Sequence, residues 1–224
     1  MKKILFFIPL LYLLSSCIEI LDDIKFNPDG SGTFKYTINL SSSKVKINSI
    51  LALDSLDGKK VPSKKEIQQK IDDFAAELSC QEGISNLHID TNYTQYVFKV
   101  QFDFSDVFAL QNGLEQAFKR TIQNLENEEL SYQWISWDGS VLIRKIPDIN
   151  EYGPKSLKSE DSELLKMGNY TSITRFDNVV SRFENESSKL SKNKRAVMLR
   201  NSIFDVLTDH HVMDNKIYVD STKY

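Results

Sequence analysis

The stretch YVFKVQFDF, residues 96–104, has the clearest strand pattern in this sequence. Aromatic and aliphatic side chains occupy every second position, and Lys99, Gln101 and Asp103 stand between them. A period of two is typical of a strand that buries one face and exposes the other. The residues before it, about 84–90, carry Leu87 and Ile89 in the same spacing. The sequence therefore predicts an antiparallel hairpin here.

The same kind of unit recurs on both sides of this hairpin. Strand-like runs at 18–26 and 33–40 flank the turn sequence Asn27-Pro28-Asp29-Gly30-Ser31-Gly32, and runs at 130–137 and 141–146 flank Asp138-Gly139. Both connecting sequences are typical of hairpin turns. Further strands are predicted near 170–180, 188–192, 194–200 and 217–219, with a short helical turn near 203–207.

Two longer helices are predicted between the hairpins. Ser63 and Glu66 form a capping-box sequence before a helix that reaches about residue 79. Ser105 or Asp106 can cap a second helix, with apolar positions repeating as far as Leu125. Residues 41–60 are polar, with a short apolar patch at 50–53, and are predicted to form a loop.

This order of elements predicts an α+β fold, with a mainly antiparallel sheet of hairpins and two longer helices packed on one face. We expect one domain over residues 17–224, interrupted by a long surface loop at about 148–168, which carries Pro154 and many charges. Residues 169–224 are expected to extend the same sheet; a small second unit is the alternative.

The N-terminus has the features of a secretory signal. Two lysines precede an apolar run at 4–14, which is shorter than the roughly 20 residues that a spanning helix needs. Leu14-Ser15-Ser16-Cys17 resembles the lipobox of bacterial lipoproteins. The resemblance implies recognition of Leu14, Ser15 and Ser16 by the lipoprotein signal peptidase, removal of residues 1–16 and lipidation of Cys17. An ordinary signal with an incidental cysteine, or an N-terminal anchor helix, is the alternative.

A lipidated Cys17 would tether the protein to a membrane without a spanning segment. Ile18 is not the aspartate that retains lipoprotein at the inner membrane, so the outer membrane is the expected location. Without residues 1–16 the chain has 26 basic and 31 acidic residues, a balance that argues against nucleic acid or an anionic bilayer as a partner of the protein surface. Cys80 is the only other cysteine and is predicted to be a small buried side chain at the end of a helix.

The turn sequence 27–33 between two strands, following Cys17, is similar to that of uncharacterised bacterial envelope lipoproteins and, more loosely, to the LppM-type lipoprotein domain. The tail from Ile173 to Val219 also resembles the first group, with Arg175-Phe176-Asp177 at the end of a strand. The resemblance implies an α+β envelope lipoprotein of undefined activity and supplies no catalytic residues.

Familiar catalytic and metal-binding motifs are not found in the sequence. His210 and His211 are adjacent, so on an extended segment they would point in opposite directions and could not share one metal ion. Trp134 and Trp137 fall on opposite faces of one predicted strand and are expected to pack in the core or the hairpin. We expect no catalytic residue, no bound metal and no cofactor.

The favoured function is therefore a non-catalytic binding or scaffolding role at the envelope, with the membrane as one partner and an envelope protein or lipid as another. One alternative is a carrier of a hydrophobic or lipid ligand, enclosed by helix faces and the aromatic side chains Tyr96, Phe98, Phe102 and Trp134. The other is a carboxylate-based envelope hydrolase, which would need two acids converging in a cleft.

Overall fold

The computed structural model describes residues 18–121, 133–146 and 159–220, and within them two main sheets and a small hairpin. The larger sheet has seven strands in the order β11-β12-β9-β1-β2-β6-β5, and the smaller has four in the order β10-β13-β8-β7. The strands are β1 (Glu19–Phe26), β2 (Gly32–Asn39), β3 (Ser55–Leu56), β4 (Lys59–Lys60), β5 (Ile84–Asn92), β6 (Val97–Phe104), β7 (Ile135–Trp137), β8 (Val141–Arg144), β9 (Asn169–Phe176), β10 (Val180–Phe183), β11 (Lys189–Leu190), β12 (Ala196–Ser202) and β13 (Asn215–Val219).

Helices account for most of the remaining described residues. The α-helices are α1 (Lys44–Leu51), α2 (Lys64–Ser79), α3 (Val107–Thr121), α5 (Ser159–Met167) and α6 (Ile203–Thr208), and the 3₁₀ helices are η1 (Ser41–Ser43) and η4 (His210–Met213). Among the described residues, no helix combines the length and the apolar character needed to cross a bilayer.

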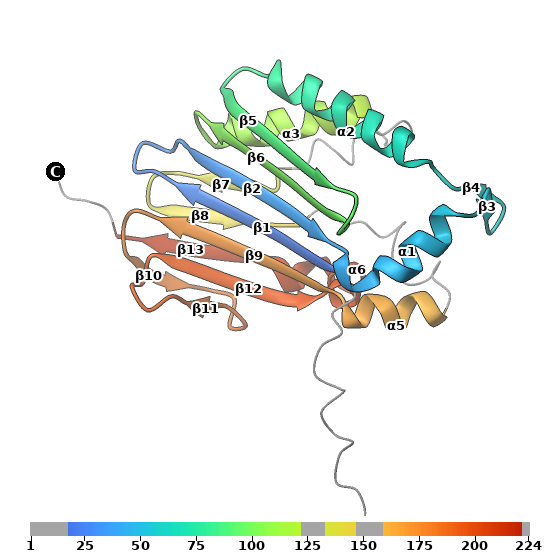
Figure 1. The fold of residues 1–224 in the computed structure, drawn as a ribbon. Coiled ribbons are helices and arrows are strands. Elements are labelled where there is room, and N and C mark those ends of the chain that lie inside the picture. The colour runs from blue at the N-terminus through green and yellow to red at the C-terminus, as the bar shows by residue number, and fades with distance from the viewer. Residues whose placement is uncertain (1–17, 122–132, 147–158, 221–224) are drawn as a thin grey trace, which may run out of the picture.

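The core lies on one face of the seven-stranded sheet, which we call the inner face. Alternate residues of its strands, such as Ile24 and Phe102, form one cluster with Leu110 of α3, Leu142 of β8 and Ile217 of β13. The smaller sheet and the pair α2–α3 therefore share the covering of this face. In Figure 1 both lie behind the large sheet or along its upper edge.

Strand β1 lies inside the large sheet and gives it two distinguishable ends. It pairs antiparallel with β2 and parallel with β9, so Glu19 is level with Asn39 and Asn169, and Phe26 is level with Gly32 and Phe176. We call these levels the Glu19 end and the Phe26 end.

The predicted α+β fold, mainly antiparallel with two longer helices on one face, is confirmed, but the strands form two sheets. Strands β9, β11 and β12 extend the large sheet as expected, whereas β10 and β13 join β7 and β8 in the smaller one. The physical reason is the short β7–β8 hairpin, whose Ile135 and Leu142 are completely buried in the core cluster. The β7–β8 hairpin therefore packs on the inner face of the large sheet and does not pair with one of its edge strands.

The local signals for turns and caps are confirmed. Ser63 and Glu66 form the reciprocal capping box of α2. The Asp106 carboxylate, not Ser105, caps α3 by accepting from the Ala109 backbone N–H at 2.8 Å. At the first residue of β2, a Cβ on Gly32 would lie 2.0 Å from the Lys25 carbonyl oxygen, so only glycine fits there.

Three expectations about loops and exposure are wrong. Residues 41–60 contain α1 and the β3–β4 hairpin, since apolar residues at 45, 47, 50 and 51 give the first part a helical spacing. Residues 159–167 of the expected long loop form α5, and 147–158 lie outside the described residues. Cys80 is exposed, because α2 buries Leu78 and Cys80 only follows as its C-cap.

Candidate functional site

A pocket of about 450 Å³ lies between the inner face of the large sheet, the helices α2 and α3, and strand β8. Its wall is predominantly apolar and rich in aromatic rings. The six aromatic residues that line it are Phe34, Tyr36, Phe74, Phe118, Trp134 and Tyr170. The volume lies within the roughly 300–1,000 Å³ of small-molecule sites.

The strand register places this pocket toward the Glu19 end. Tyr36 and Ile38 of β2 both line it, and Ile38 is level with Ile20 of β1. Tyr170 of β9 is also level with Ile20 and also lines the pocket. The pocket therefore lies at the level of the third residue after Cys17.

A buried charged cluster forms part of the pocket wall. Asp22 of β1 and Arg144 of β8 are 1% and 5% exposed, and both line the pocket. The guanidinium binds the carboxylate with two hydrogen bonds, Nη1 to Oδ1 at 2.7 Å and Nη2 to Oδ2 at 2.8 Å. Two bonds of this kind are the favourable geometry for an arginine–carboxylate pair removed from water.

Two hydroxyls of β9 complete the hydrogen bonding of the carboxylate. Ser172 donates to Asp22 Oδ1 at 2.9 Å and accepts from Arg144 Nη1 at 2.7 Å. The Tyr170 hydroxyl donates to Asp22 Oδ2 at 2.5 Å. Because Ser172 is level with Asp22 in the parallel pair, the pairing of β1 with β9 brings them together.

The cluster shifts the pKa of its neighbours in directions that keep the present protonation. Burial raises the pKa of Tyr36 to about 12, and the Asp22 charge adds to this effect. Burial, followed by the same charge, raises the pKa of Tyr170 well above its usual value. Burial opposes the charge of Arg144, but attraction to Asp22 outweighs it and raises the arginine pKa. Both phenols therefore stay protonated at neutral pH.

Two polar side-chain atoms of the pocket residues lack a hydrogen-bond partner within the described part of the chain. Arg144 Nε and Gln111 Oε1 are buried and have no hydrogen-bond partner among the described residues. Both residues line the pocket. Buried polar atoms are nearly always paired, so this donor and this acceptor are exceptions among the residues that line the pocket.

The pocket has two carboxylates, and each already has a cationic partner. Asp22 is bound by Arg144, and Glu115 forms an ion pair with Lys119 of its own helix. The hydrolase alternative requires two acids that converge on a substrate. Within the described residues this pocket instead has carboxylates held by arginine and lysine.

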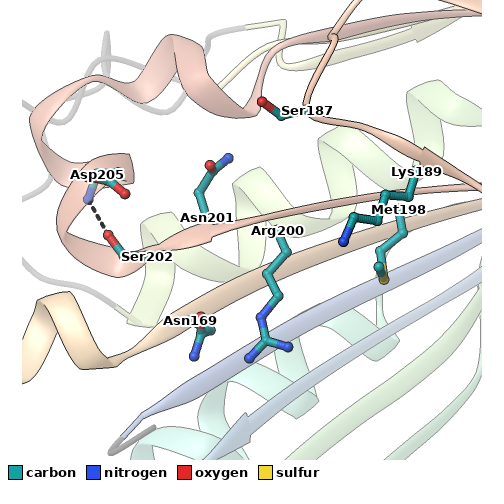
Figure 2. A pocket seen from close by; sticks show the side chains of 8 residues that line it. All are labelled: Asn169, Ser187, Lys189, Met198, Arg200, Asn201, Ser202 and Asp205. Carbon is teal, nitrogen blue, oxygen red and sulfur yellow. Dashed lines mark hydrogen bonds between the residues drawn. The ribbon is translucent and has the colours of Figure 1, made fainter.

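A second hollow, of about 410 Å³, is polar and lies over β12 (Figure 2). Figure 2 shows Arg200 and Lys189 extending over the sheet from neighbouring strands, with Met198 beside the lysine. Arg200 and Met198 alternate with the buried Val197 and Leu199, so they lie on the outer face. The hollow lacks the apolar wall of the first pocket.

The structure separates most of the residues singled out in the sequence. Of the four aromatic residues expected around a ligand, only Trp134 lines the pocket. Phe102 is completely buried in the core, Phe98 packs against Tyr93, and the Tyr96 hydroxyl donates to Asn48.

The prediction that both tryptophans pack in the core or the hairpin is confirmed, since Trp134 and Trp137 both pack against the core cluster. They do not lie on opposite faces of one strand, because Trp134 comes one residue before β7 begins. His211 Nδ1 lies 2.9 Å from Asp214 Oδ2, and no group of metal-ligating side chains forms within the described residues. Cys17 and its predicted peptidase-recognition residues Leu14, Ser15 and Ser16 lie outside the described part of the chain.

Comparisons with known proteins give little to add to this geometry. No family model matches the chain, and no curated protein matches it. Among solved structures, the chain is similar to the NMR structure of the folded domain of the Mycobacterium tuberculosis LppM protein. The identity is 12%, the TM-score is 0.42, and the alignment covers 96% of each chain. A similarity at this level does not establish a family for the chain.

Proposed function

We propose that this protein is a lipid-anchored bacterial envelope protein that binds an amphipathic, largely hydrophobic ligand in the pocket between the large sheet and α2–α3. The observation that carries this proposal is an apolar, aromatic-lined hollow whose wall also contains the Asp22–Arg144 pair. Apolar walls with a few placed polar groups are typical of small-molecule sites.

The polar groups define the chemistry of the ligand. Because Arg144 already has a carboxylate partner, and the other charged lining residue is the carboxylate Glu115, the pocket wall has no unpaired positive charge to attract an anion. Arg144 Nε offers one donor and Gln111 Oε1 offers one acceptor. We therefore propose a ligand with an apolar body and an uncharged polar part, such as a hydroxyl, ester or amide.

The position of the pocket fits a ligand that partitions into membranes. Ile38 and Tyr170 line the pocket level with Ile20, three residues after Cys17. If Cys17 carries acyl chains as the lipobox predicts, the pocket lies close to the bilayer surface. The membrane that we propose for the anchor is the outer membrane, as the residue after Cys17 predicts.

Ligand binding can be tested with the fluorescent apolar probe N-phenyl-1-naphthylamine and residues 18–224, which need no detergent. The test variant is Val100→Phe, which places a ring in the pocket, and the matched control is Val97→Phe on the outer face of the same strand. We expect saturable binding by the parent chain and the control, and at least about tenfold weaker binding by Val100→Phe. Thermal melting checks that both variants fold.

Two results would count against the pocket. The parent chain could fail to bind the probe with saturation, or both valine variants could bind it with the same affinity. For the anchor, a labelled palmitate fed to expressing cells should be incorporated by the parent chain and not by Cys17→Ala. Equal incorporation by both chains would refute lipidation at this cysteine.

A further inference from the structure

Residues 44–65, which we call the arm, extend from the body of the protein. They comprise α1, the β3–β4 hairpin and the first two residues of α2, and α1 contains no buried residue. Every residue from 52 to 60 is exposed. Three apolar side chains of the arm are also exposed: Val45 by 82%, Leu53 by 47% and Leu56 by 44%. These side chains have no core to cover within the described structure.

The arm is basic, although the protein as a whole is acidic. It carries six lysines and two aspartates, within a chain that from residue 17 onward has 26 basic and 31 acidic residues. Lys60 forms an ion pair with Glu66 at 2.6 Å, and Lys64 lies over the Tyr96 ring. The other four, Lys44, Lys46, Lys59 and Lys65, have no acidic partner among the described residues.

Both ends of the arm are fixed at the Glu19 end of the large sheet. Strand β2 ends at Asn39, level with Glu19, and η1 and α1 follow directly. The Leu40 backbone N–H donates to the carbonyl of Tyr96, whose ring is the one that Lys64 covers. Figure 1 shows α1 and the β3–β4 hairpin at the end of the sheet where β1 begins.

From these observations we propose that the arm lies on the surface of an anionic phospholipid bilayer. Lysines are drawn to anionic headgroups within about a Debye length, roughly 8 Å at physiological salt, and neighbouring apolar side chains can enter the interface. An acidic protein would complement the lysines but gives no role to exposed Val45, Leu53 and Leu56. This inference rests on the lipid anchor of the proposed function, because Cys17 lies two residues before Glu19.

The inference can be tested on the lipidated chain reconstituted into vesicles. In a Cys80→Ser background, Val45→Cys carries an environment-sensitive fluorophore, and Lys192→Cys at the Phe26 end is the matched control site. Vesicles of phosphatidylglycerol and phosphatidylethanolamine are compared with vesicles of phosphatidylcholine alone. We expect the label at 45 to shift to the blue and lose quenching by iodide only on the anionic vesicles. The label at 192 should stay fully quenched on both.

A charge variant identifies the cause. Replacing Lys44, Lys46, Lys59 and Lys65 by glutamine should restore iodide quenching at position 45 to its level on neutral vesicles. Full quenching at 45 while the chain floats with anionic vesicles would overturn the inference and leave the anchor intact. A chain that floats with neither vesicle would overturn both. Shielding that appears without vesicles and rises with protein concentration would show a second copy on the arm, which also overturns it.

Discussion

The two ends of the inner face use the same strands for opposite purposes. At the Phe26 end, Phe26 stacks on Trp137 and Phe176 and meets Phe104 edge to face, with ring centroids 5.6–5.9 Å apart. Four residues earlier on the same strand, Asp22 faces Arg144 beside a pocket. At the Phe26 end the rings pack against one another, whereas at the Glu19 end a buried ion pair lies beside an open and mostly apolar pocket.

This difference teaches that the stability and the proposed function of the protein depend on separate parts of one sheet. Interlocked aromatic rings contribute apolar burial and pair contacts and leave no room for a ligand. A buried ion pair contributes little net stability, because its attraction is offset by the loss of hydration. We therefore expect the Phe26 end to contribute most of the free energy of unfolding. At the Glu19 end, replacing Asp22 and Arg144 together by apolar residues should change that free energy little.

The largest effect is expected at the Phe26 end. Phe26→Ala removes a ring that is 1% exposed and touches three other aromatic rings. We expect the free energy of unfolding to fall by about 4–5 kcal/mol, at the upper part of the range for buried phenylalanine. Urea denaturation measures it. A loss below about 1 kcal/mol would remove the proposed division between the two ends.

The buried pair at the Glu19 end should respond differently to one and to two substitutions. Arg144→Met leaves the Asp22 carboxylate buried without its cation, at a cost of about 3–4 kcal/mol. Adding Asp22→Leu should restore most of the lost free energy of unfolding, because no charge of this pair then remains buried. A double-mutant cycle by urea denaturation measures the coupling. A double variant no more stable than Arg144→Met would contradict this explanation.

Alkaline pH should weaken the Glu19 end selectively through its two partly buried tyrosines, Tyr36 and Tyr170. The pKa of Tyr36 is raised to about 12, against about 10 for an exposed tyrosine, so the unfolded chain releases this proton first. Stability from this group is complete below pH 10 and is lost as pH rises through about 12. The loss is about 2–3 kcal/mol. Denaturation between pH 9 and 12 should show a smaller decline for Tyr36→Phe, and identical slopes would refute the shift.

The smallest effect is expected for the arginine–aspartate pair on the outer face. Asp23 binds Arg175 with three hydrogen bonds between 2.8 and 2.9 Å, but the arginine side chain is 47% exposed. Because water can replace this partner, Asp23→Ala should cost about 1 kcal/mol or less. The same denaturation assay compares it with the neighbouring Asp22. A loss equal to that of Arg144→Met would show that burial is not what separates the two pairs.

Local elements could be predicted from the sequence because their signals are local. The capping box at Ser63 and Glu66, the alternation in residues 96–104 and the Asp138-Gly139 turn each depend on a few adjacent side chains. The assignment of hairpins to two sheets depends on contacts far apart in the chain, which periodicity does not encode. Helix α1 was missed because its exposed Val45 and lysines obscure an apolar stripe that is only half-buried.

The sequence contains fewer indications of the pocket than of the local elements. Asp22 occupies the buried parity of its strand together with Ile24 and Phe26, and Arg144 shares a face with Leu142. A charge in such a position is a signal of a buried partner. The sequence gives no means of pairing residues 122 positions apart, so the partner, the pocket and the role of Tyr170 required the structure.

The parallel pairing of β1 with β9 also constrains the order in which the chain can fold. Asp22 and its partner Ser172 are separated by 150 residues, so β1 is synthesised long before β9 is available to pair with it. Until then one edge of β1 is open, and open edges of this kind invite pairing with other chains. We therefore expect the nascent protein to depend on a holding chaperone, and chains truncated before residue 169 to aggregate instead of persisting as soluble fragments.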